Sequence, residues 1–484
     1  MGFQPTSSGR RAREYTYVGI RSRMCANPAT GPAFAGSASA AGRKSAMNSY
    51  VTRPLRKPPS RGAPRSCAGA ARRRRDASRS AARAPRRIRP GTPTSAGRSF
   101  ARRPALPILA AVKSHDTADD TVLFHTAGRT GVITLNRPRA LNALTHPMVL
   151  RIAAALHTWA QDPAVTQVLI RGAGERGLCA GGDIRAIHDD ARAGTTASAG
   201  FWRDEYRLNA LIARYPKPYV ALMDGIVMGG GVGVSAHGSV RIVTERSRVA
   251  MPETGIGFVP DIGGTHLLGR APGLLGTHLA LTGSAVGAAD AMLCALADHF
   301  VPAARLPELT EALAEAPVHE VLPQYTGTPA PGELAERRSW IDRCYAADTV
   351  EEIVDRLLAE GDPAAKEAAE TILAKSPTAL KVTLAAVGRA RALGSLEQVL
   401  AQEYRTSCHA LRSPDLVEGI RAQVVDKDRK PRWSPSDLRG VTDEDVARFF
   451  APLGPGHEPD LSPDAPGEPG APGEPGEPSG PGHR

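Results

Sequence analysis

Between residues 119 and 301 the chain alternates short apolar runs with amphipathic stretches, and this alternation constrains its fold more than any other feature. The runs Gly131–Leu135, Val168–Arg171 and Tyr219–Met223 have the length and the β-branched content of buried strands. The stretches His146–Gln161 and Ala199–Arg214 place apolar residues at helical spacing. Because strands alternate with helices, the sequence predicts an α/β body.

The strand signals stop after the run Asp298–Val301. Residues 317–336 contain several Pro and Gly residues, which predicts a connector. Residues 337–425 read as almost wholly helical. We therefore expect a core over residues 119–316, followed by the connector and a helical C-terminal part over residues 337–450.

The excess of positive over negative charge lies in the first quarter of the chain. The net charge of +12 would by itself suggest nucleic acid or an anionic membrane as a partner. Residues 1–113, however, hold 25 Lys and Arg residues against two acids, so the rest of the chain is acidic. The segment 1–113 is rich in Arg, Ala and Ser and has no apolar period, which predicts disorder.

Three interpretations of residues 1–113 stay open. The segment is a dispensable tail, an organelle transit peptide, or a basic arm that binds nucleic acid. A tail leaves the protein in the cytoplasm, whereas a transit peptide would make it mitochondrial. The nucleic-acid interpretation is the minor alternative, since the excess of basic over acidic residues lies in segment 1–113 alone.

The remaining composition excludes several other classes of protein. Residues 452–484 contain ten Pro and eight Gly, which predicts a disordered acidic tail. The six cysteines lie far apart and form no Cys-x-x-Cys pair, which argues against a zinc or iron–sulfur site and against a disulfide framework. No run of 18 uncharged apolar residues occurs, so we expect no membrane span.

Two Gly-rich turns follow predicted strands and precede predicted helices. They are Cys179-Ala-Gly-Gly-Asp183 and Met228-Gly-Gly-Gly-Val-Gly233. Glycine at such a turn lets the backbone approach a ligand closely, and the start of a helix aims free N–H groups at negative charge. Two such turns brought together would form an oxyanion hole that polarises a carbonyl. Either turn alone is explained as well by tight packing between a strand and a helix.

Four motifs around these turns carry a family resemblance. In chain order they are Asn136-Arg-Pro-Arg-Ala-Leu-Asn-Ala-Leu144, Cys179-Ala-Gly-Gly-Asp-Ile184, Asp224-Gly-Ile-Val-Met-Gly-Gly-Gly231, and Pro252-Glu253 with Gly263-Gly264. In this order and spacing, residues 122–301 resemble the crotonase (enoyl-CoA hydratase/isomerase) superfamily.

The resemblance implies a crotonase-like α/β core of repeated ββα units that binds an acyl-CoA substrate. It implies that the backbone N–H groups of Ala180 and Gly230 bind the thioester carbonyl. It requires no metal and no cofactor beyond the CoA of the substrate, and it is compatible with a homo-oligomer.

The resemblance also bears on the type of reaction. Hydratases of the superfamily use two glutamates, one three residues after the second oxyanion glycine and the other 20 residues further on. Here the first position is Gly233 and the second is Glu253. Because hydration needs an acid and a base to add the two parts of water, the missing carboxylate argues against a hydratase. An isomerase could work with Glu253 alone, so an enoyl-CoA isomerase or hydratase remains the alternative.

A closer resemblance covers essentially the whole predicted body. Several segments are similar to the 3-hydroxyisobutyryl-CoA hydrolases of the superfamily, namely Phe201–Tyr206, Tyr215–Leu222, Met251–Gly264, Ser376–Thr383, Glu403–Arg405, Glu418–Arg421 and Asp426–Trp433. This resemblance implies hydrolysis of the thioester of 3-hydroxyisobutyryl-CoA to CoA and 3-hydroxyisobutyrate, a step of valine breakdown.

Matched by motif, the resemblance assigns roles to single residues. Glu253 would attack the thioester carbonyl or activate a water, Asp261 would orient Glu253 or the water, and Glu205 would hold the substrate's hydroxyl. Because the phosphates of CoA are anionic and the body is acidic, Arg137 and Arg139 are candidate CoA-binding residues.

Each of these residues also has a structural interpretation. Glu205 lies among charged neighbours and by pattern alone reads as part of a solvated helix face. Asp261 and Asp183 both precede predicted helices and read as N-caps. Cys179 has no His nearby in sequence, so packing in an apolar interior explains it better than a role as a nucleophile.

Overall fold

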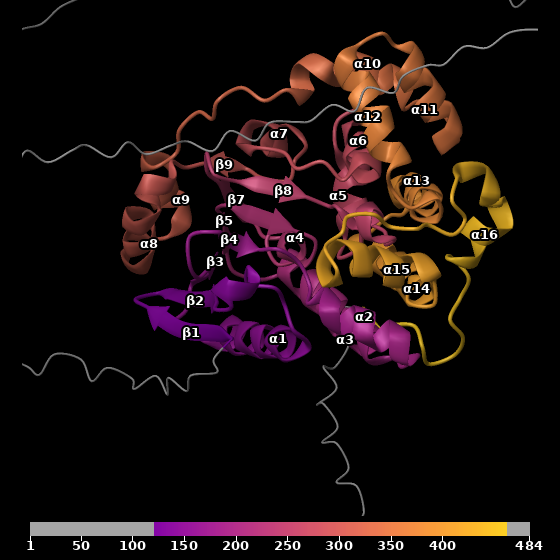
Figure 1. Cartoon of the computed structure of the whole chain (residues 1–484). Coiled ribbons are helices and arrows are strands. Elements are labelled where there is room, and N and C mark those ends of the chain that lie inside the picture. The colour runs from indigo at the N-terminus through magenta and orange to yellow at the C-terminus, as the bar shows by residue number, and fades with distance from the viewer. Residues whose placement is uncertain (1–120, 462–484) are drawn as a thin grey trace, which may run out of the picture. The chain divides into compact units, whose positions relative to one another are not determined.

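The computed structural model describes residues 121–461 (Figure 1). The predicted N-terminal segment 1–113 and residues 462–484 of the predicted tail lie outside the described residues. Within residues 121–461, no helix is long and apolar enough to cross a membrane.

Two sheets form the core of the fold. The larger has six strands in the order β1-β2-β3-β5-β7-β9, and in it only β1 runs antiparallel to its neighbour. The smaller is parallel, in the order β4-β6-β8. The strands are β1 (Val122–Ala127), β2 (Thr130–Leu135), β3 (Gln167–Gly172), β4 (Gly177–Cys179), β5 (Tyr219–Met223), β6 (Ile226–Met228), β7 (Val240–Val243), β8 (Arg248–Ala250) and β9 (His299–Phe300).

Three consecutive strand pairs follow one plan. In the pairs β3–β4, β5–β6 and β7–β8, the first strand joins the large sheet and the second joins the small one. Each pair is followed by helix: α2 (Ile184–Ala193), α4 (Gly230–Gly233), or the 3-10 turn η2 (Glu253–Ile256) with α5 (Gly264–Arg270). The predicted α/β fold with a crotonase-like core of repeated ββα units is therefore confirmed.

Helices surround the sheets and make up nearly all of the C-terminal part. The remaining helices are α1 (His146–Gln161), α3 (Ala197–Ala213), α6 (Leu275–Thr282), α7 (Ala288–Leu293), α8 (Leu306–Glu315), α9 (Val318–Val321), α10 (Leu334–Cys344), α11 (Val350–Ala359), α12 (Pro363–Leu373), α13 (Pro377–Ala392), α14 (Leu396–Ala410), α15 (Pro414–Ile420) and α16 (Asp443–Arg448), with the 3-10 turns η1 (Pro138–Ala140), η3 (Ala303–Arg305), η4 (Leu322–Gln324) and η6 (Leu438–Gly440) and the π-helical turn η5 (Arg421–Val425).

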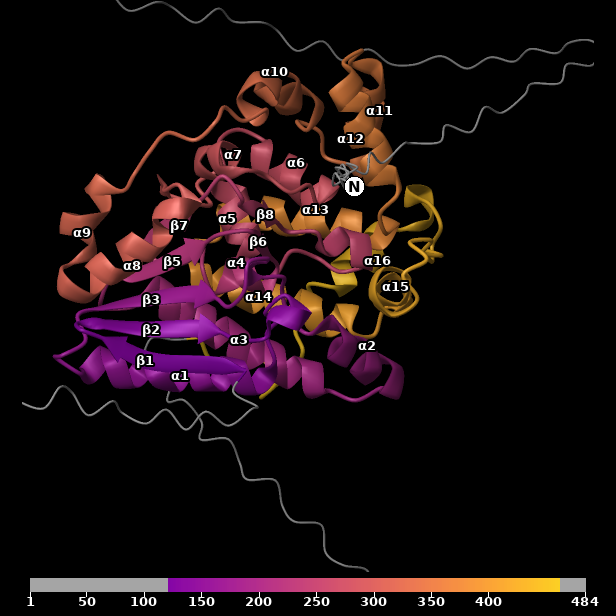
Figure 2. The same cartoon turned by 60° about the vertical axis from the view of Figure 1, so that its left-hand side comes forward.

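Both faces of the large sheet are covered, which explains why its strands read as continuous apolar runs. Successive side chains of a strand point to opposite faces. Val132 and Leu169 therefore join a cluster with α8 and α9, whereas Ile133 and Ile170 join the main core. Figure 2 shows these strands side by side, with α8 and α9 near one end of the sheet.

The C-terminal helices pack directly on the α/β core. Helix α13 contacts α5, α14 contacts α3, and α15 contacts both α2 and η2. Their apolar side chains belong to the same main cluster as the strands, as Leu380 and Leu400 illustrate. The helical part therefore shares the core's interior and forms part of the surroundings of any site on α2, α3 or η2.

The body extends further along the chain than the sequence predicts. Residues 452–461 were expected to belong to a disordered tail, and there the prediction is wrong. Leu461 is buried in the main cluster, Glu458 forms an ion pair with Arg405, and Arg207 donates to the carbonyl of Asp460. A Pro- and Gly-rich composition suggested disorder, but these tertiary contacts hold the segment. The predicted connector similarly contains the short helix α9 and the turn η4.

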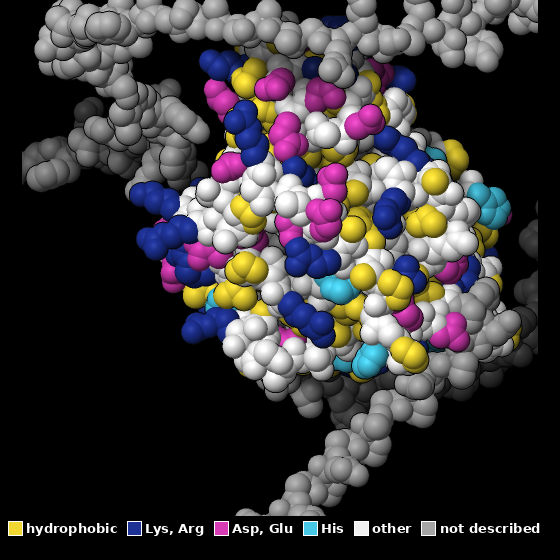
Figure 3. Space-filling model, turned by 90° about the vertical axis from the view of Figure 1, so that its right-hand side faces the viewer, with side chains coloured by type: hydrophobic (Ala, Val, Ile, Leu, Met, Phe, Trp, Pro, Cys, Tyr) yellow, Lys and Arg dark blue, Asp and Glu magenta, His cyan; other side chains and the backbone are white. Residues whose placement is uncertain are grey.

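Basic and acidic side chains are mixed on one face of the described part. On the face drawn in Figure 3, Lys and Arg side chains alternate with Asp and Glu side chains and form no continuous basic patch. This face accordingly has no broad electrostatic attraction for a polyanion.

Candidate active site

The candidate site lies where the three strands of the small sheet end. Cys179, Met228 and Ala250 are the last residues of β4, β6 and β8. Because these strands are parallel neighbours, their carboxyl ends meet at one edge, where ligands of open α/β sheets bind. This topology brings together the two Gly-rich turns and the turn that carries Glu253.

Two backbone amides of these turns are available to a ligand. Within residues 121–461, neither the amide of Gly182 nor that of Gly230 donates a hydrogen bond. The two are close, since a Cβ built on Gly230 would lie 3.3 Å from the nitrogen of Gly182. The same Cβ would lie 2.6 Å from Oε1 of Glu205, so any larger residue at this position would displace the Glu205 carboxylate.

The prediction that Ala180 contributes to the oxyanion hole is wrong. Its amide donates to the carbonyl of Leu141 at 3.0 Å and is therefore engaged within the protein. The free amide lies two residues further on, at Gly182. The sequence identified the right motif. Which of its amides is free depends on the hydrogen bond from Ala180 to Leu141, a residue outside the motif.

A cavity of about 330 Å³ opens beside these amides. Apolar and aromatic side chains form most of its wall, and Glu205, Glu253 and Asp261 face into it. Oε1 of Glu205 and Oε2 of Glu253 are buried and have no hydrogen-bond partner among the described residues. Unpaired buried carboxylate oxygens are costly, so they indicate a place for a polar ligand.

Burial dominates the electrostatics of these acids. Glu205 is only 2% exposed and Glu253 only 6%. Burial raises the pKa of both carboxyls well above the ordinary value, and the charge of the neighbouring Asp261 raises them further. Each acid is thus more basic than a solvated carboxylate, as a proton acceptor in a neutral-pH reaction needs to be.

Asp261 is held by a hydrogen-bonded pair of side chains from two helices. The hydroxyl of Tyr206, on α3, donates to Oδ2 of Asp261 at 2.7 Å. Oγ of Ser407, on α14, lies 2.8 Å from the same tyrosine hydroxyl. Burial raises the pKa of Asp261 to about 7, and the hydrogen bond from Tyr206 opposes that rise.

A fourth buried acid supports the turn behind Asp261. Glu403, on α14, accepts hydrogen bonds from the amides of Gly263 and Thr265 and from the Thr265 hydroxyl, at 2.6–2.9 Å. Burial raises the pKa of Glu403 to about 8, against the opposing effect of these bonds. The loop from Asp261 to the start of α5 is therefore fixed by the C-terminal helices.

The predicted CoA-binding arginines differ in their surroundings. The guanidinium of Arg137 donates to the carbonyl of Ala143 at 2.6 Å and forms a 3.0 Å ion pair with Asp183, so it ties the first motif to the Gly182 turn. Arg139 is exposed on η1 and makes no hydrogen bond with any described residue. Of the two, Arg139 is the one free to bind a phosphate.

The structure corrects two of the pattern-based interpretations and supports a third. Glu205 is buried rather than solvated, and Asp183 does not cap α2, because its carboxylate binds Arg137. Cys179 is fully buried, and burial raises the pKa of its thiol to about 12. A thiol with such a pKa is a packing group rather than a nucleophile.

Sequence reasoning missed several residues of the site. Tyr206, on α3, contacts Asp261, and Glu403, on α14, contacts the loop that follows Asp261. These contacts join residues far apart in the sequence, so the only signal for a role was that both residues lie in segments similar to the hydrolases. Lys375 also lines the cavity, from the segment that joins α12 to α13. Leu416, Ile420 and Gln423, from α15 and η5, also line the cavity.

Within residues 121–461, no group of three or more His, Cys, Asp or Glu side chains is placed to hold a metal ion. The arrangement can bind a carbonyl oxygen through two amides and present buried carboxylates to the adjacent carbon. Fold and site together define an α/β enzyme that acts on an activated acyl group.

Comparison with known proteins identifies the family. The family model for enoyl-CoA hydratase/isomerase matches residues 130–450, and the chain belongs to this family. Curated relatives include the mitochondrial 3-hydroxyisobutyryl-CoA hydrolase of Danio rerio, 44% identical over 69% of this chain and 91% of the relative. The Homo sapiens protein of the same name is 42% identical over 71% of this chain and 92% of the relative.

Solved structures give the same fold under other names. A structure titled carnitinyl-CoA dehydratase from Mycobacterium thermoresistibile is 53% identical, with a TM-score of 0.69, over 72% of this chain and 100% of that chain. One titled enoyl-CoA hydratase from Rhodobacter sphaeroides 2.4.1 is 46% identical, with a TM-score of 0.66, over 69% of this chain and 98% of that chain.

Proposed function

We propose that this protein hydrolyses the thioester of 3-hydroxyisobutyryl-CoA to CoA and 3-hydroxyisobutyrate, a step of valine breakdown. One observation carries the proposal. Two free backbone amides, at Gly182 and Gly230, open into a cavity that also holds the unpaired carboxylate oxygen of Glu253. The names of the curated relatives support the choice of acyl group.

The amides act on the oxygen of the thioester carbonyl. When a nucleophile adds to the carbonyl carbon, that oxygen becomes an anion, and the N–H groups of Gly182 and Gly230 donate to it. Loss of one such donor typically costs about 2.7–4 kcal/mol of transition-state stabilisation. The sulfur then leaves as the CoA thiolate, which takes up a proton.

Glu253 supplies the nucleophile by one of two routes. Its carboxylate adds to the carbonyl carbon, expels CoA and forms an anhydride, which water then cleaves to release the acid and restore Glu253. Alternatively, Glu253 takes a proton from water and the resulting hydroxide adds directly. Single turnover in ¹⁸O-labelled water detects the first route when water attacks the Glu253 carbonyl of the anhydride, because only then does label enter Glu253. Attack on the acyl carbonyl, like the second route, places the label in the released acid.

The other acids support this reaction. Asp261 lies close enough to raise the pKa of Glu253 by its charge, and orients Glu253 or the water. The unpaired oxygen of Glu205 accepts the hydrogen bond of the substrate's 3-hydroxyl, which would satisfy that buried atom. The exposed guanidinium of Arg139 binds a phosphate of CoA.

The second candidate is hydration or isomerisation of an enoyl-CoA, which the titles of the two solved structures favour. Against a hydratase stands Gly233, at the position where the second glutamate would lie. A Cβ there would lie 2.8 Å from Nδ2 of Asn209 and 3.0 Å from Cβ of Ile262, so a larger side chain would require these side chains to shift.

The experiment is a comparison of substrates on the purified full chain. Incubation with 3-hydroxyisobutyryl-CoA should release free thiol, measured with a chromogenic disulfide, and Glu253→Gln should abolish the release. Gly287→Ala is a suitable control, because no backbone or side-chain atom lies within 3.8 Å of the added Cβ. Water addition to, or double-bond migration in, an enoyl-CoA without thiol release would replace the proposal by the second candidate.

We also propose a mitochondrial location, in place of the cytoplasm expected from the sequence. The names of the vertebrate relatives support it. The transit-peptide interpretation of residues 1–113 then predicts that the mature protein lacks most of that segment. The mass of the N-terminal peptide from the native source tests this, and an intact Met1 would contradict import with cleavage.

A further inference from the structure

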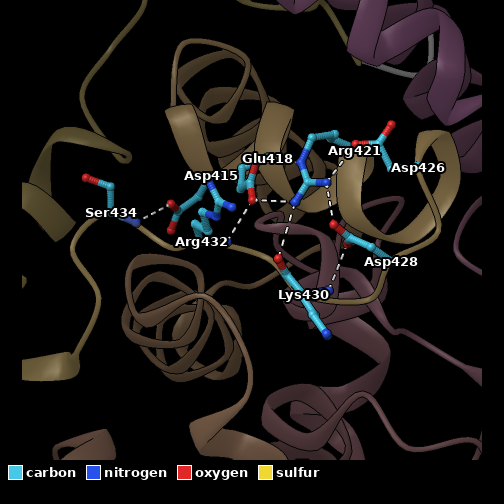
Figure 4. Close-up of polar contacts among 8 residues, drawn as sticks. All are labelled: Asp415, Glu418, Arg421, Asp426, Asp428, Lys430, Arg432 and Ser434. Atoms are coloured by element: carbon cyan, nitrogen blue, oxygen red, sulfur yellow. Dashed lines mark hydrogen bonds and ion pairs between the residues drawn. The ribbon is translucent and has the colours of Figure 1, made fainter.

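One wall of the cavity is formed by a segment to which no role has been assigned. Leu416, Ile420 and Gln423 line the cavity, and they come from α15 and η5. The chain then turns through residues 426–434 and passes back beside α15. This segment carries a dense polar network, drawn in Figure 4.

Arg421 lies at the centre of the network. We call Arg421 and the groups that it binds the Arg421 hub; these groups are Glu418, Asp426, Asp428 and the carbonyl of Lys430. The guanidinium binds both oxygens of Glu418, at 2.7 and 2.8 Å. One of its nitrogens also donates to Asp426 and Asp428, each at 2.7 Å, and another donates to the Lys430 carbonyl at 3.2 Å. Two-pronged binding of a carboxylate fixes orientation as well as distance.

The hub holds a turn that would otherwise be unfavourable. Lys427 and Arg429 both adopt left-handed backbone conformations, with φ near +59° and +57°. Such backbone conformations are unfavourable for residues other than glycine and persist only where the surroundings impose them. Glu418 adds a further tie, because its Oε1 accepts from the amide of Arg432 at 2.7 Å.

A second anchor lies at the start of α15. Asp415 is 1% exposed and accepts hydrogen bonds from the hydroxyl of Ser376 at 2.5 Å and from the amide of Ser434 at 2.8 Å. Ser376 in turn donates its amide to the carbonyl of Thr254 at 3.3 Å. Both ends of α15 are thus tied down, and one tie reaches the residue that follows Glu253.

Helix α15 presses directly on the turn that carries Glu253. A Cβ built on Gly419 would lie 2.4 Å from the carbonyl oxygen of Ile256, and one on Gly257 would lie 2.2 Å from the carbonyl oxygen of Asp415. The two backbones are therefore in contact, with no side chain between them to absorb a shift. A displacement of α15 moves η2, and Glu253 is the first residue of η2.

We propose that the Arg421 hub is a positioning device for the acyl-CoA site. It fixes the α15–η5 wall of the cavity and, through the backbone contact with η2, the position of Glu253. Arg421 itself lies outside the cavity lining and acts through these elements. The inference deepens the proposed hydrolysis and rests on it for the reaction that is measured.

The test compares Arg421→Gln, Asp428→Asn and the double variant by kcat and KM for thiol release, well below the melting temperature. Because a misplacement of about 1 Å can cost about 10²-fold in rate, we expect kcat/KM to fall between about tenfold and 10²-fold for Arg421→Gln. Asp428→Asn should give a smaller loss, and the double variant should fall short of the product of the two. Arg421→Lys keeps the charge but not the planar fork, so it should not restore activity.

The matched control is Arg343→Gln, which removes an exposed ion pair with Glu360. Arg343 lies on α10, and Glu360 directly follows α11. It should leave kcat and KM unchanged. If the hub variants lower only the melting temperature and keep the wild-type kcat and KM, the hub is merely structural and the proposal is overturned. The same holds if the control loses as much activity.

A further measurement separates this inference from the proposed function. If the wild-type protein releases no thiol from 3-hydroxyisobutyryl-CoA, the hydrolase proposal fails, but binding of CoA can still be measured by calorimetry. A dissociation constant about tenfold higher for Arg421→Gln than for the wild type would support the positioning role, as for other losses of preorganisation. Equal dissociation constants would overturn it.

Discussion

Replacing Tyr206 by Phe removes one hydroxyl and tests how the charge of Asp261 is controlled. The hydroxyl donates to Oδ2 of Asp261 at 2.7 Å inside a buried site. A hydrogen bond to a charged group is worth about 1.5–3 kcal/mol, and 1.36 kcal/mol corresponds to about one pKa unit. Because the bond stabilises the carboxylate, its loss should raise the pKa of Asp261 by about one to two units.

The effect should be visible as a shift of the acidic limb of the pH profile. Burial places the pKa of Asp261 at about 7 in the wild type, so about half of the protein carries the Asp261 carboxylate at pH 7. After a rise of one to two units, about a tenth to a hundredth does. We therefore expect kcat/KM at pH 7 to fall about five- to fiftyfold, whereas the two proteins converge at alkaline pH.

The assay is thiol release between pH 5.5 and 10, with kcat/KM fitted at each pH. Tyr404→Phe is the control, since Tyr404 packs edge-on against Tyr206 but donates to the carbonyl of Ala199 and does not touch Asp261. An acidic limb that stays in place for Tyr206→Phe refutes the reasoning. So does an equal shift in the control.

Three further predictions follow from the same geometry. Gly230→Ala keeps the backbone amide but places a methyl group 2.6 Å from Oε1 of Glu205 and 3.3 Å from the nitrogen of Gly182, so it crowds the place of the thioester oxygen. The value of kcat for thiol release should fall by about 10²-fold while the circular dichroism spectrum is retained, and normal turnover would contradict the placement of that oxygen between the two amides. Glu205→Gln should stabilise the fold above pH 5: burial raises the pKa of Glu205, so the folded state holds a proton that the unfolded chain releases above about pH 4.5, and stability is lost as pH rises. Urea unfolding at pH 5 and pH 8 checks this, and a gain that is no larger at pH 8 would contradict it. Arg139→Gln should raise KM several-fold for the CoA thioester but not for the corresponding pantetheine thioester, which lacks phosphates, and equal effects on both would exclude phosphate binding.

Local pattern was sufficient where a segment's environment is uniform along its length. The bounds of α1 and β5 agree with the sequence to the residue, because a half-buried helix leaves a periodic pattern and a doubly buried strand leaves a continuous apolar run. Strands β4 and β6 have only three residues each, and the sequence did not predict them. Their pairing joins distant segments, and so short a strand has no period to detect.

The residues of the site divide in the same way. The Gly-rich turns and Glu253 stand out in the sequence because their types and spacing are unusual for purely structural turns. Glu205 does not, since its charged neighbours make the local pattern that of a solvated face. It is buried because α3 packs on the Gly230 turn, where a Cβ built on Gly230 would lie 2.6 Å from Oε1 of Glu205, and this contact joins separate elements of the fold.

By itself, the sequence determined the α/β class, the order of the ββα units, the family and the acid at position 253. These depend on residue type and local spacing, which survive without coordinates. Only the tertiary structure decided that Gly182 rather than Ala180 offers its amide, that Tyr206 donates to Asp261, and that Arg421 binds Glu418, Asp426 and Asp428. Each of these is a hydrogen bond or contact between elements, and the direction of an N–H group or the burial of a carboxylate is set only when those elements meet.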